Sequence, residues 1–137
     1  MTAVYQGSRS YLGEQQQASG INKVKTDRQL KVTCDGIEGD FIGDKVLHGG
    51  REKALHHFPT DHYQKLSDTF PSSAKMMVPG SIGENISSLK CVEQDVCISD
   101  KFRMGSVILQ ISQPRKPCWK IDEKYHSRGV ATFIHSQ

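Results

Sequence analysis

The sequence lacks the features of membrane, secreted and nucleic-acid-binding proteins. Its longest apolar runs are short, such as Val107-Ile108-Leu109, whereas a membrane helix needs about 20 apolar residues. The N-terminus has no basic start followed by an apolar stretch, so we expect no secretory signal and a cytoplasmic location. The net charge of +3 is mild and spread along the chain. Without a basic stripe, we expect neither a nucleic-acid partner nor a membrane partner.

Paired cysteines are also lacking. The chain has 4 cysteines and no Cys-x-x-Cys, so neither a zinc ribbon nor a disulfide framework is indicated. We interpret Cys34, Cys91 and Cys97 as small buried apolar side chains. The histidines of the His56-His57 pair and His62 do not have the i, i+4 spacing of a helical zinc motif. The sequence therefore does not predict a zinc site.

What is present indicates one mainly β domain over residues 1–137. A length of 137 residues, 36% hydrophobic and 24% charged, suits a soluble globular domain. Short apolar segments predict a hairpin within residues 21–32, a strand at 53–58 and a hairpin at 101–111 that turns at Gly105-Ser106. Because Ile108 makes the last strand apolar on both faces, we expect that strand to be central. Helices are predicted at Thr60–Thr69, with Thr60 as N-cap, and within the last eleven residues. Many short strands with one or two helices favour a barrel-like domain.

The segment "SQPRKPCWK", residues 112–120, carries the most specific chemistry. Its two prolines remove backbone donors and fix φ, so the segment cannot continue a sheet. Cys118 lies within three residues of Arg115, Lys116 and Lys120, and nearby cations favour a thiolate. The pattern predicts a stiff loop that presents a reactive sulfur.

Other constellations leave alternatives open. Cys118 could act as a hydrolase nucleophile with one of the 6 histidines as base, although spacing selects none of them and no Gly-x-Ser-x-Gly is present. "HGGREK" (48–53) is either a phosphate-binding loop, with exposed N–H groups and cations, or a plain glycine turn. Gly83-Glu84-Asn85 alone is typical of a turn.

Taken in order, four segments resemble one family, the MOSC domain, named after the C-terminal domain of molybdenum-cofactor sulfurases. They are "GIEGD", "HGGREKAL", "GENIS" and "ISDKFRMGSVILQISQPRKPC", and the likeness is to the stand-alone bacterial form. The resemblance implies a mixed-strand β-barrel of the pyruvate-kinase type. It also implies binding of the molybdenum cofactor, a pterin dithiolene with a phosphate, and of pyridoxal phosphate.

Carried over by position, the resemblance makes Cys118 the catalytic residue and the molybdenum ligand. It also implies a cofactor-binding set made of His48, Gly49, Gly50, Arg51, Glu84, Asn85 and Arg115. A metal with sulfur ligands favours a thiolate, and basic residues would offset an anionic cofactor. Metal ligation would then explain why a cysteine lies between two prolines in this loop.

The resemblance implies reduction of N-hydroxylated small molecules or bases, an oxidoreductase activity. Because no flavin, haem or iron–sulfur motif is visible, a separate electron-donor protein is expected beside the small-molecule substrate. Family members continue past the cysteine loop into further strands and a helical tail. We therefore expect these to be missing and a homo-oligomer to cover the sheet edge. The competing hypothesis is a non-catalytic module that carries a cofactor, sulfur or small ligand.

Overall fold

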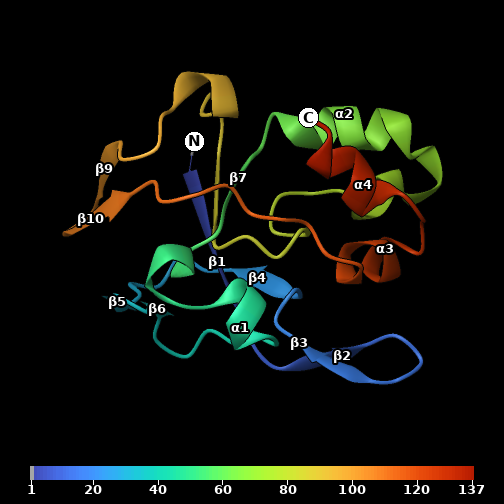
Figure 1. Cartoon of the computed structure of the whole chain (residues 1–137), viewed down its shortest axis with the longest axis horizontal. Coiled ribbons are helices and arrows are strands. Elements are labelled where there is room, and N and C mark those ends of the chain that lie inside the picture. Colours follow the sequence, from blue (N-terminus) through green and yellow to red (C-terminus); the bar gives the residue numbers. More distant parts are fainter. Residues whose placement is uncertain (1) are drawn as a thin grey trace.

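A four-stranded sheet forms the centre of the computed structural model, which describes residues 2–137. β1 (Thr2–Gly7) lies between two antiparallel neighbours, β4 (Lys23–Lys25) and β8 (Ile86–Ser88) (Figure 1). β7 (His57–Pro59) adds to the far side of β8 and runs parallel to it. The strand order is therefore β4-β1-β8-β7.

The remaining strands form three separate two-stranded ladders. These are β2 (Ser10–Leu12) with β3 (Gln17–Ser19), β5 (Val32–Thr33) with β6 (Gly36–Ile37), and β9 (Lys101–Met104) with β10 (Val107–Gln110). Within residues 2–137 these pairings do not close into a barrel. The structure is mainly β, with mixed strand directions and short helices, as the sequence predicts.

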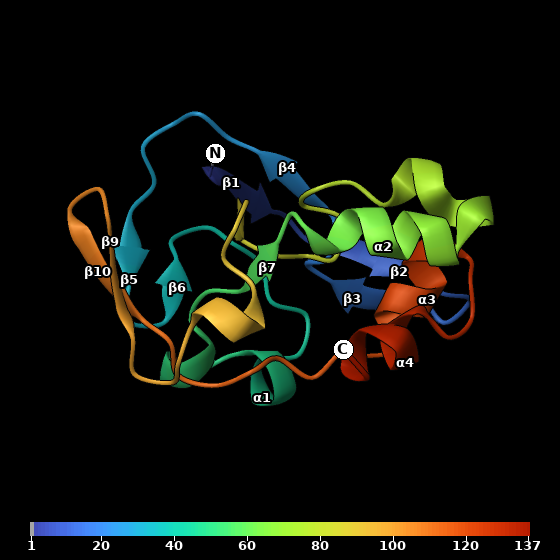
Figure 2. The ribbon, with the colours of Figure 1, turned by 90° about the horizontal axis from the view of Figure 1, so that it is seen from above.

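The longer helices gather at one end of the molecule and the β9–β10 hairpin projects from the other (Figures 1 and 2). The helices are α1 (Lys45–His48), α2 (His62–Thr69), α3 (Lys120–Tyr125) and α4 (Val130–His135), with 3-10 turns η1 (Arg51–Lys53), η2 (Pro71–Met76) and η3 (Glu93–Asp95). α2 and η2 connect β7 to β8, the crossover that parallel neighbours require. None of the helices described combines the length and hydrophobicity of a membrane span.

One apolar cluster joins the sheet to helices α2, α3 and α4. Its buried members are Ile21, Phe58, Tyr63, Leu66, Met77, Ile82, Ile121, Tyr125 and Val130. Burial of this apolar surface is the main driving force that holds the C-terminal helices against the sheet. The start of α3, which follows Cys118 directly, is thereby fixed in place.

The structure confirms the two predicted helices with altered bounds. α2 starts at His62 rather than Thr60, and its N-cap is Asp61. The spacing of Tyr63, Leu66 and Phe70 predicts one apolar stripe on this helix; Tyr63 and Leu66 are buried on α2, and Phe70 is its C-cap. The tail forms α4, anchored by the buried Val130. The predicted strand at 53–58 is limited to β7 at His57–Pro59.

Three other predictions were wrong. The expected hairpin within residues 21–32 does not form, because β4 pairs with β1 and β5 pairs with β6. The strand around Ile108 is not central: the hairpin turn is at Gly105-Ser106 as expected, but β10 pairs only with β9 within residues 2–137 and Ile108 is 54% exposed. The cysteines expected in the core are outside it, since Cys34 and Cys97 are exposed and Cys91 is half-buried.

Candidate functional site

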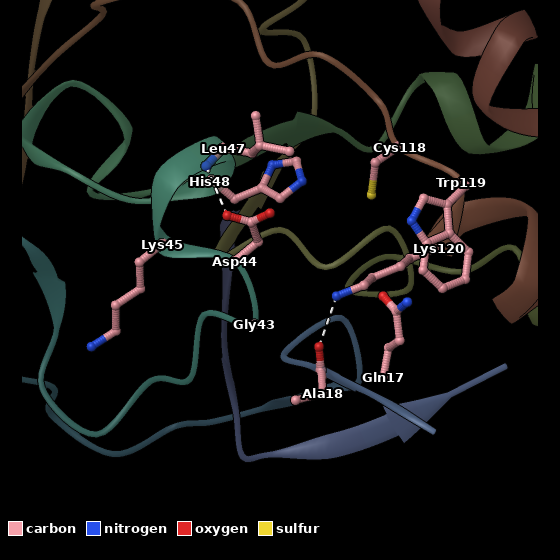
Figure 3. A pocket seen from close by; sticks show the side chains of 10 residues that line it. All are labelled: Gln17, Ala18, Gly43, Asp44, Lys45, Leu47, His48, Cys118, Trp119 and Lys120. Atoms are coloured by element: carbon pink, nitrogen blue, oxygen red, sulfur yellow. Dashed lines mark hydrogen bonds between the residues drawn. The ribbon is translucent and has the colours of Figure 1, made fainter. Parts of the chain in front are cut away.

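A cavity of about 440 Å³ lies between α1 and the segment that leads into α3 (Figure 3). Its lining residues are Gln17, Ala18, Gly43, Asp44, Lys45, Leu47, His48, Cys118, Trp119 and Lys120. The volume is within the usual range for small-molecule sites. Two of the segments that the sequence singled out, the His-Gly-Gly block and the cysteine loop, meet in this cavity.

Local hydrogen bonds shape the α1 side of the cavity. Asp44 is the N-cap of α1 and its Oδ1 accepts from the backbone N–H groups of Val46 and Leu47 at 3.0 and 2.9 Å. Hydrogen bonds to the charged carboxylate, above all the one from Leu47, lower the pKa of Asp44. Gly49 closes the turn, where an added Cβ would lie 2.7 Å from the Lys45 carbonyl oxygen. A glycine after His48 is therefore a packing requirement.

Cys118 lies on the opposite side of the cavity and its sulfur projects into the space (Figure 3). The chain from Ser112 to Cys118 forms no strand, as the two prolines predict. The carbonyl oxygen of Cys118 accepts from the Ile121 N–H at 3.1 Å, which joins the loop to the first turn of α3. The thiol is thus half-buried and its backbone is held by the helix that follows.

Arg115 connects the two sides. Its guanidinium donates to the carbonyl oxygens of His48, at 2.8 Å, and of Lys53. Burial lowers the pKa of Arg115, and within residues 2–137 it forms no ion pair with a carboxylate. Ser112 adds a hydrogen bond to the Glu52 carbonyl oxygen. The cysteine loop is therefore attached along residues 48–53.

The other polar groups of the cavity are His48, Lys120 and Gln17. Burial lowers the pKa of His48, and the positive charge of Arg115 lowers it further, so the neutral imidazole predominates near pH 7. Lys120 Nζ donates to the Ala18 carbonyl oxygen at 2.7 Å, which attaches α3 to β3. The cavity thus combines a thiol, a neutral imidazole, two lysines and one carboxylate.

Glu84 does not line this cavity. It is fully buried and its carboxylate accepts from the hydroxyls of Tyr63 and Ser87, both at 2.6 Å, and from two backbone N–H groups, of Gly80 and Ile82. Four donors around one carboxylate satisfy a buried charge. The position organises the turn before β8, and a cofactor contact at Glu84 stays a prediction.

Asn85 belongs to a second buried network under the sheet. Its amide donates to Asp40 Oδ2 at 2.9 Å and accepts from the His56 backbone N–H at 3.1 Å. Asp40 also pairs with Lys23 at 2.7 Å. These contacts fix β1, β4 and the start of β7 relative to one another, and Asn85 does not line the cavity.

Of the predicted site residues, the cavity brings together Cys118 and His48. Arg115 and Gly49 do not line the cavity themselves, but they hold the residues that do. Gly50 precedes η1 with a positive φ of 93°, and Arg51 is exposed on η1. Lys120, which the sequence singled out as a cation near Cys118, also lines the cavity. The lining residues that sequence reasoning missed are Gln17, Ala18, Gly43, Asp44, Lys45, Leu47 and Trp119. An acid just before a short helical segment is the N-cap signal that marks Asp44, whereas nothing local marks Gln17.

Metal ligation by protein groups alone is not supported. Within residues 2–137 no three His, Cys, Asp or Glu side chains are arranged to hold a metal ion. Cys118 is the single cysteine that lines the cavity. A metal here would need further ligands that residues 2–137 do not supply.

Comparison with known families matches residues 44–136 to the MOSC domain. This chain belongs to the MOSC domain family. The match begins at Asp44, the N-cap of α1, and extends through α4, so it includes both sides of the cavity. The family suggested by four short segments is thus confirmed over most of the chain.

Relatives of this MOSC chain have names that bear on function. It is 36% identical to protein YiiM of Escherichia coli strain K12 over 118 residues, which are 86% of this chain and 53% of YiiM. It is 32% identical over 108 residues to a protein of Gibberella moniliformis named "Reductase", covering 78% of this chain and 19% of that protein. The crystal structure of E. coli YiiM superposes with a TM-score of 0.74 and 29% identity over 99% of this chain and 57% of YiiM. The chain thus spans about half the length of YiiM.

Proposed function

We propose that this chain is the part of a MOSC protein that binds the molybdenum cofactor through Cys118, and that the protein reduces N-hydroxylated small molecules. The observation that carries the proposal is the thiol of Cys118 facing one cavity together with His48, from a segment 70 residues earlier in the chain. The relative named "Reductase" supports a redox role.

The cavity fits this cofactor in three respects. A single thiolate suits a metal whose other ligands come with the pterin dithiolene, because residues 2–137 bring no three His, Cys, Asp or Glu side chains together to hold a metal by themselves. Lys45 and Lys120 line the cavity against one carboxylate, Asp44, which leaves an excess of positive charge for an anionic cofactor. The volume admits a small ligand next to the sulfur.

When bound, the cofactor supplies the two-electron chemistry, and the protein supplies binding, orientation and protons. The reaction is R–NHOH + 2 e⁻ + 2 H⁺ → R–NH₂ + H₂O, with both electrons from a separate electron-donor protein. Lys120 would hold negative charge beside Cys118. The neutral imidazole of His48 can accept a hydrogen bond from the N-hydroxyl group and orient it. Arg115 keeps the two sides of the cavity at a fixed separation.

The same proposal extends to fold and assembly. We propose the barrel of the family and a homo-oligomer in the cytoplasm, as the resemblance implies. The exposed edges of the β9–β10 ladder support assembly, since unpaired strand edges are usually covered.

Molybdenum content tests the proposal directly. The wild type, Cys118→Ala and Cys97→Ala are purified from a host that makes the cofactor and from a deficient host, and molybdenum is measured by elemental mass spectrometry. Cys97 is exposed and does not line the cavity, which makes it the matched control. We expect near-stoichiometric metal in the wild type and in Cys97→Ala, and loss in Cys118→Ala and in the deficient host.

Other outcomes decide between the hypotheses. Equal molybdenum in Cys118→Ala would contradict the ligand assignment. A folded wild type that takes up no molybdenum, even after reconstitution with the cofactor, would favour the non-catalytic carrier. Pyridoxal phosphate serves as a competing ligand in the reconstitution, because the family resemblance implies its binding as well.

A further inference from the structure

We propose that the surface around the mouth of the cavity is a docking site for a small acidic electron-transfer protein. We define the docking surface by Val46, Leu47, Arg51, Lys116 and Trp119. The inference rests on the proposed function, because it names the class of partner that brings electrons to the same site. Its first test measures binding to the metal-free protein, so that test does not depend on turnover.

Three large apolar side chains of the docking surface are exposed. Val46 is 89% exposed, Leu47 is 61% exposed and Trp119 is 47% exposed. Leu47, on α1, and Trp119, next to Cys118, line the cavity from its two sides (Figure 3). α1 buries none of its residues, and Val46 does not line the cavity. Neither the core nor a ligand in the cavity therefore accounts for Val46, whereas apolar side chains grouped on a surface are typical of a protein contact.

The positive charge of the chain is concentrated beside these side chains. Of the 18 Lys or Arg and 15 Asp or Glu in the chain, residues 44–53 and 112–120 contain 6 and 2, a net charge of +4. The rest of the chain contains 12 and 13, a net charge of −1. The two segments lie against each other, because Arg115 donates to the carbonyl oxygens of His48 and Lys53. The fold thus gathers on one side a charge that the sequence distributes over distant positions.

The cations at the edge of the docking surface are not neutralised by carboxylates. None of the ion pairs found within residues 2–137 includes Arg51, Lys53 or Lys116. Lys53 Nζ donates to the carbonyl oxygen of Leu47 at 2.9 Å, a neutral acceptor that leaves the charge of the ammonium uncompensated. Because none of these three cations lines the cavity, an anionic ligand in the cavity does not account for them.

An apolar centre with a basic rim fits a partner that has an apolar centre and an acidic rim. Opposite charges steer two proteins together and raise the association rate, and electron-transfer partners form small, transient interfaces of this kind. The sulfur of Cys118 projects into the cavity whose mouth the docking surface surrounds (Figure 3). A carrier bound there therefore faces the proposed cofactor site. Two reduced one-electron carriers supply the two electrons: the N–O bond breaks, two protons are taken up, amine and water form, and both carriers leave oxidised.

Exposed residues elsewhere on the chain provide matched controls. Lys75, on η2, and Val78, just after it, lie outside the two basic segments and do not line the cavity. Lys75 is exposed and Val78 is 52% exposed. Lys116→Glu is therefore compared with Lys75→Glu, and Val46→Ala with Val78→Ala.

Binding is measured by isothermal titration calorimetry of the metal-free chain with three probes of different charge. An acidic plant-type [2Fe–2S] ferredoxin and an acidic flavodoxin represent the partner, and the basic cytochrome c is the control of opposite charge. We expect both acidic carriers to bind, with a Kd that rises at high salt because ions screen the attraction, and cytochrome c not to bind. Lys116→Glu should raise the Kd about fivefold or more and Val46→Ala about twofold or more. Lys75→Glu and Val78→Ala should leave the Kd unchanged.

Electron delivery is measured with the cofactor-loaded protein and with benzamidoxime as the N-hydroxylated probe. Reduced ferredoxin is compared with reduced methyl viologen, a small donor that needs no docking surface. Val46→Ala should lower the ferredoxin-driven rate relative to the viologen-driven rate, and Val78→Ala should leave this ratio unchanged. Because Val46→Ala changes no charge, it does not alter the electrostatic attraction of either donor.

Hydrogen exchange in the presence of ferredoxin locates the contact, and we expect protection in residues 44–53 and 112–120. Protection confined to other residues, binding of neither acidic carrier, equal binding of cytochrome c, or equal effects of Lys116→Glu and Lys75→Glu would overturn the inference. Binding of the acidic carriers to a chain that takes up no molybdenum would support the docking surface and contradict the proposed function. Molybdenum uptake and viologen-driven turnover without carrier binding would do the reverse.

Discussion

The guanidinium of Arg115 donates a hydrogen bond of 2.8 Å to the carbonyl oxygen of His48, 67 residues earlier in the chain. A second hydrogen bond, to the Lys53 carbonyl oxygen, fixes the fork of the guanidinium. A planar group with several donors can reach two carbonyls at once, which an ammonium cannot do in the same geometry. The relationship sets the distance between α1 and the cysteine loop, and so the width of the cavity.

We predict that Arg115→Lys and Arg115→Ala lower the free energy of unfolding by about 1.5–3 kcal/mol, because charged hydrogen bonds to half-buried carbonyls are lost. Urea unfolding measures the loss. The loop should also open, so alkylation of Cys118, mapped by peptide mass spectrometry, should become faster. Arg103→Ala, on the exposed hairpin, is the control. Unchanged alkylation in Arg115→Ala would show that the loop is held by other contacts.

The sequence predicted the meeting of Cys118 and His48 through family resemblance, not through spacing. Motif order identified the two segments, and the structure places both side chains in one cavity. The same resemblance grouped Glu84 with them, yet its carboxylate lies in the core. A Gly-Glu-Asn block has the same short polar sequence whether it lies at a ligand site or in the core, so the sequence alone does not show whether Glu84 is buried.

The prediction for Ile108 failed for a related reason. Apolar residues on both faces are typical of a central strand, but centrality depends on partners that come from distant parts of the chain. Within residues 2–137 β10 pairs with β9 and with no other strand. The helices were easier to predict, since the stripe of Tyr63 and Leu66 is a local periodicity.

Glu84 should contribute to stability through its buried hydrogen bonds. In Glu84→Gln, the amide N–H₂ replaces one acceptor oxygen and faces N–H or O–H donors, so a buried hydrogen bond is lost. We expect a loss of about 1–3 kcal/mol in urea unfolding, whereas the exposed Glu14→Gln should change little. Molybdenum uptake by the folded fraction of Glu84→Gln tests the predicted cofactor contact, and uptake equal to that of the wild type would contradict it. A stable variant that lacks molybdenum would instead support a cofactor contact.

The two lysine–carboxylate pairs should differ in their response to neutralisation. Lys23 and Asp40 have side chains only 5% and 7% exposed, whereas Lys31 and Glu38 are 73% and 61% exposed. Removal of one partner from a buried pair leaves an uncompensated charge, so Asp40→Asn should cost about 3–5 kcal/mol. Glu38→Gln should cost less than about 1 kcal/mol. Thermal unfolding of both variants measures the contrast, and similar losses would mean that water reaches Asp40.

His56 should make the protein sensitive to acid. Burial lowers its pKa to about 3, and the positive charges of Arg115 and Lys23 act in the same direction. The folded state therefore binds the proton more weakly than the unfolded state, whose histidine has a pKa of about 6.5. As the pH falls from about 6.5 toward 3, the unfolded state takes up the proton first, and stability is lost at up to about 1.4 kcal/mol per pH unit. Above pH 6.5 this contribution is constant.

His56→Gln removes the titrating group and keeps a polar side chain of similar reach, so its unfolding free energy should fall less steeply between pH 6.5 and pH 4. His135→Gln, at the exposed end of α4, is the control and should follow the wild type. Urea unfolding at a series of pH values compares the three slopes. Parallel curves for the wild type and His56→Gln would mean that His56 is as easily protonated in the folded protein as in the unfolded chain. Its position near the cations of Arg115 and Lys23 argues against that result, because a further positive charge there would be repelled by both.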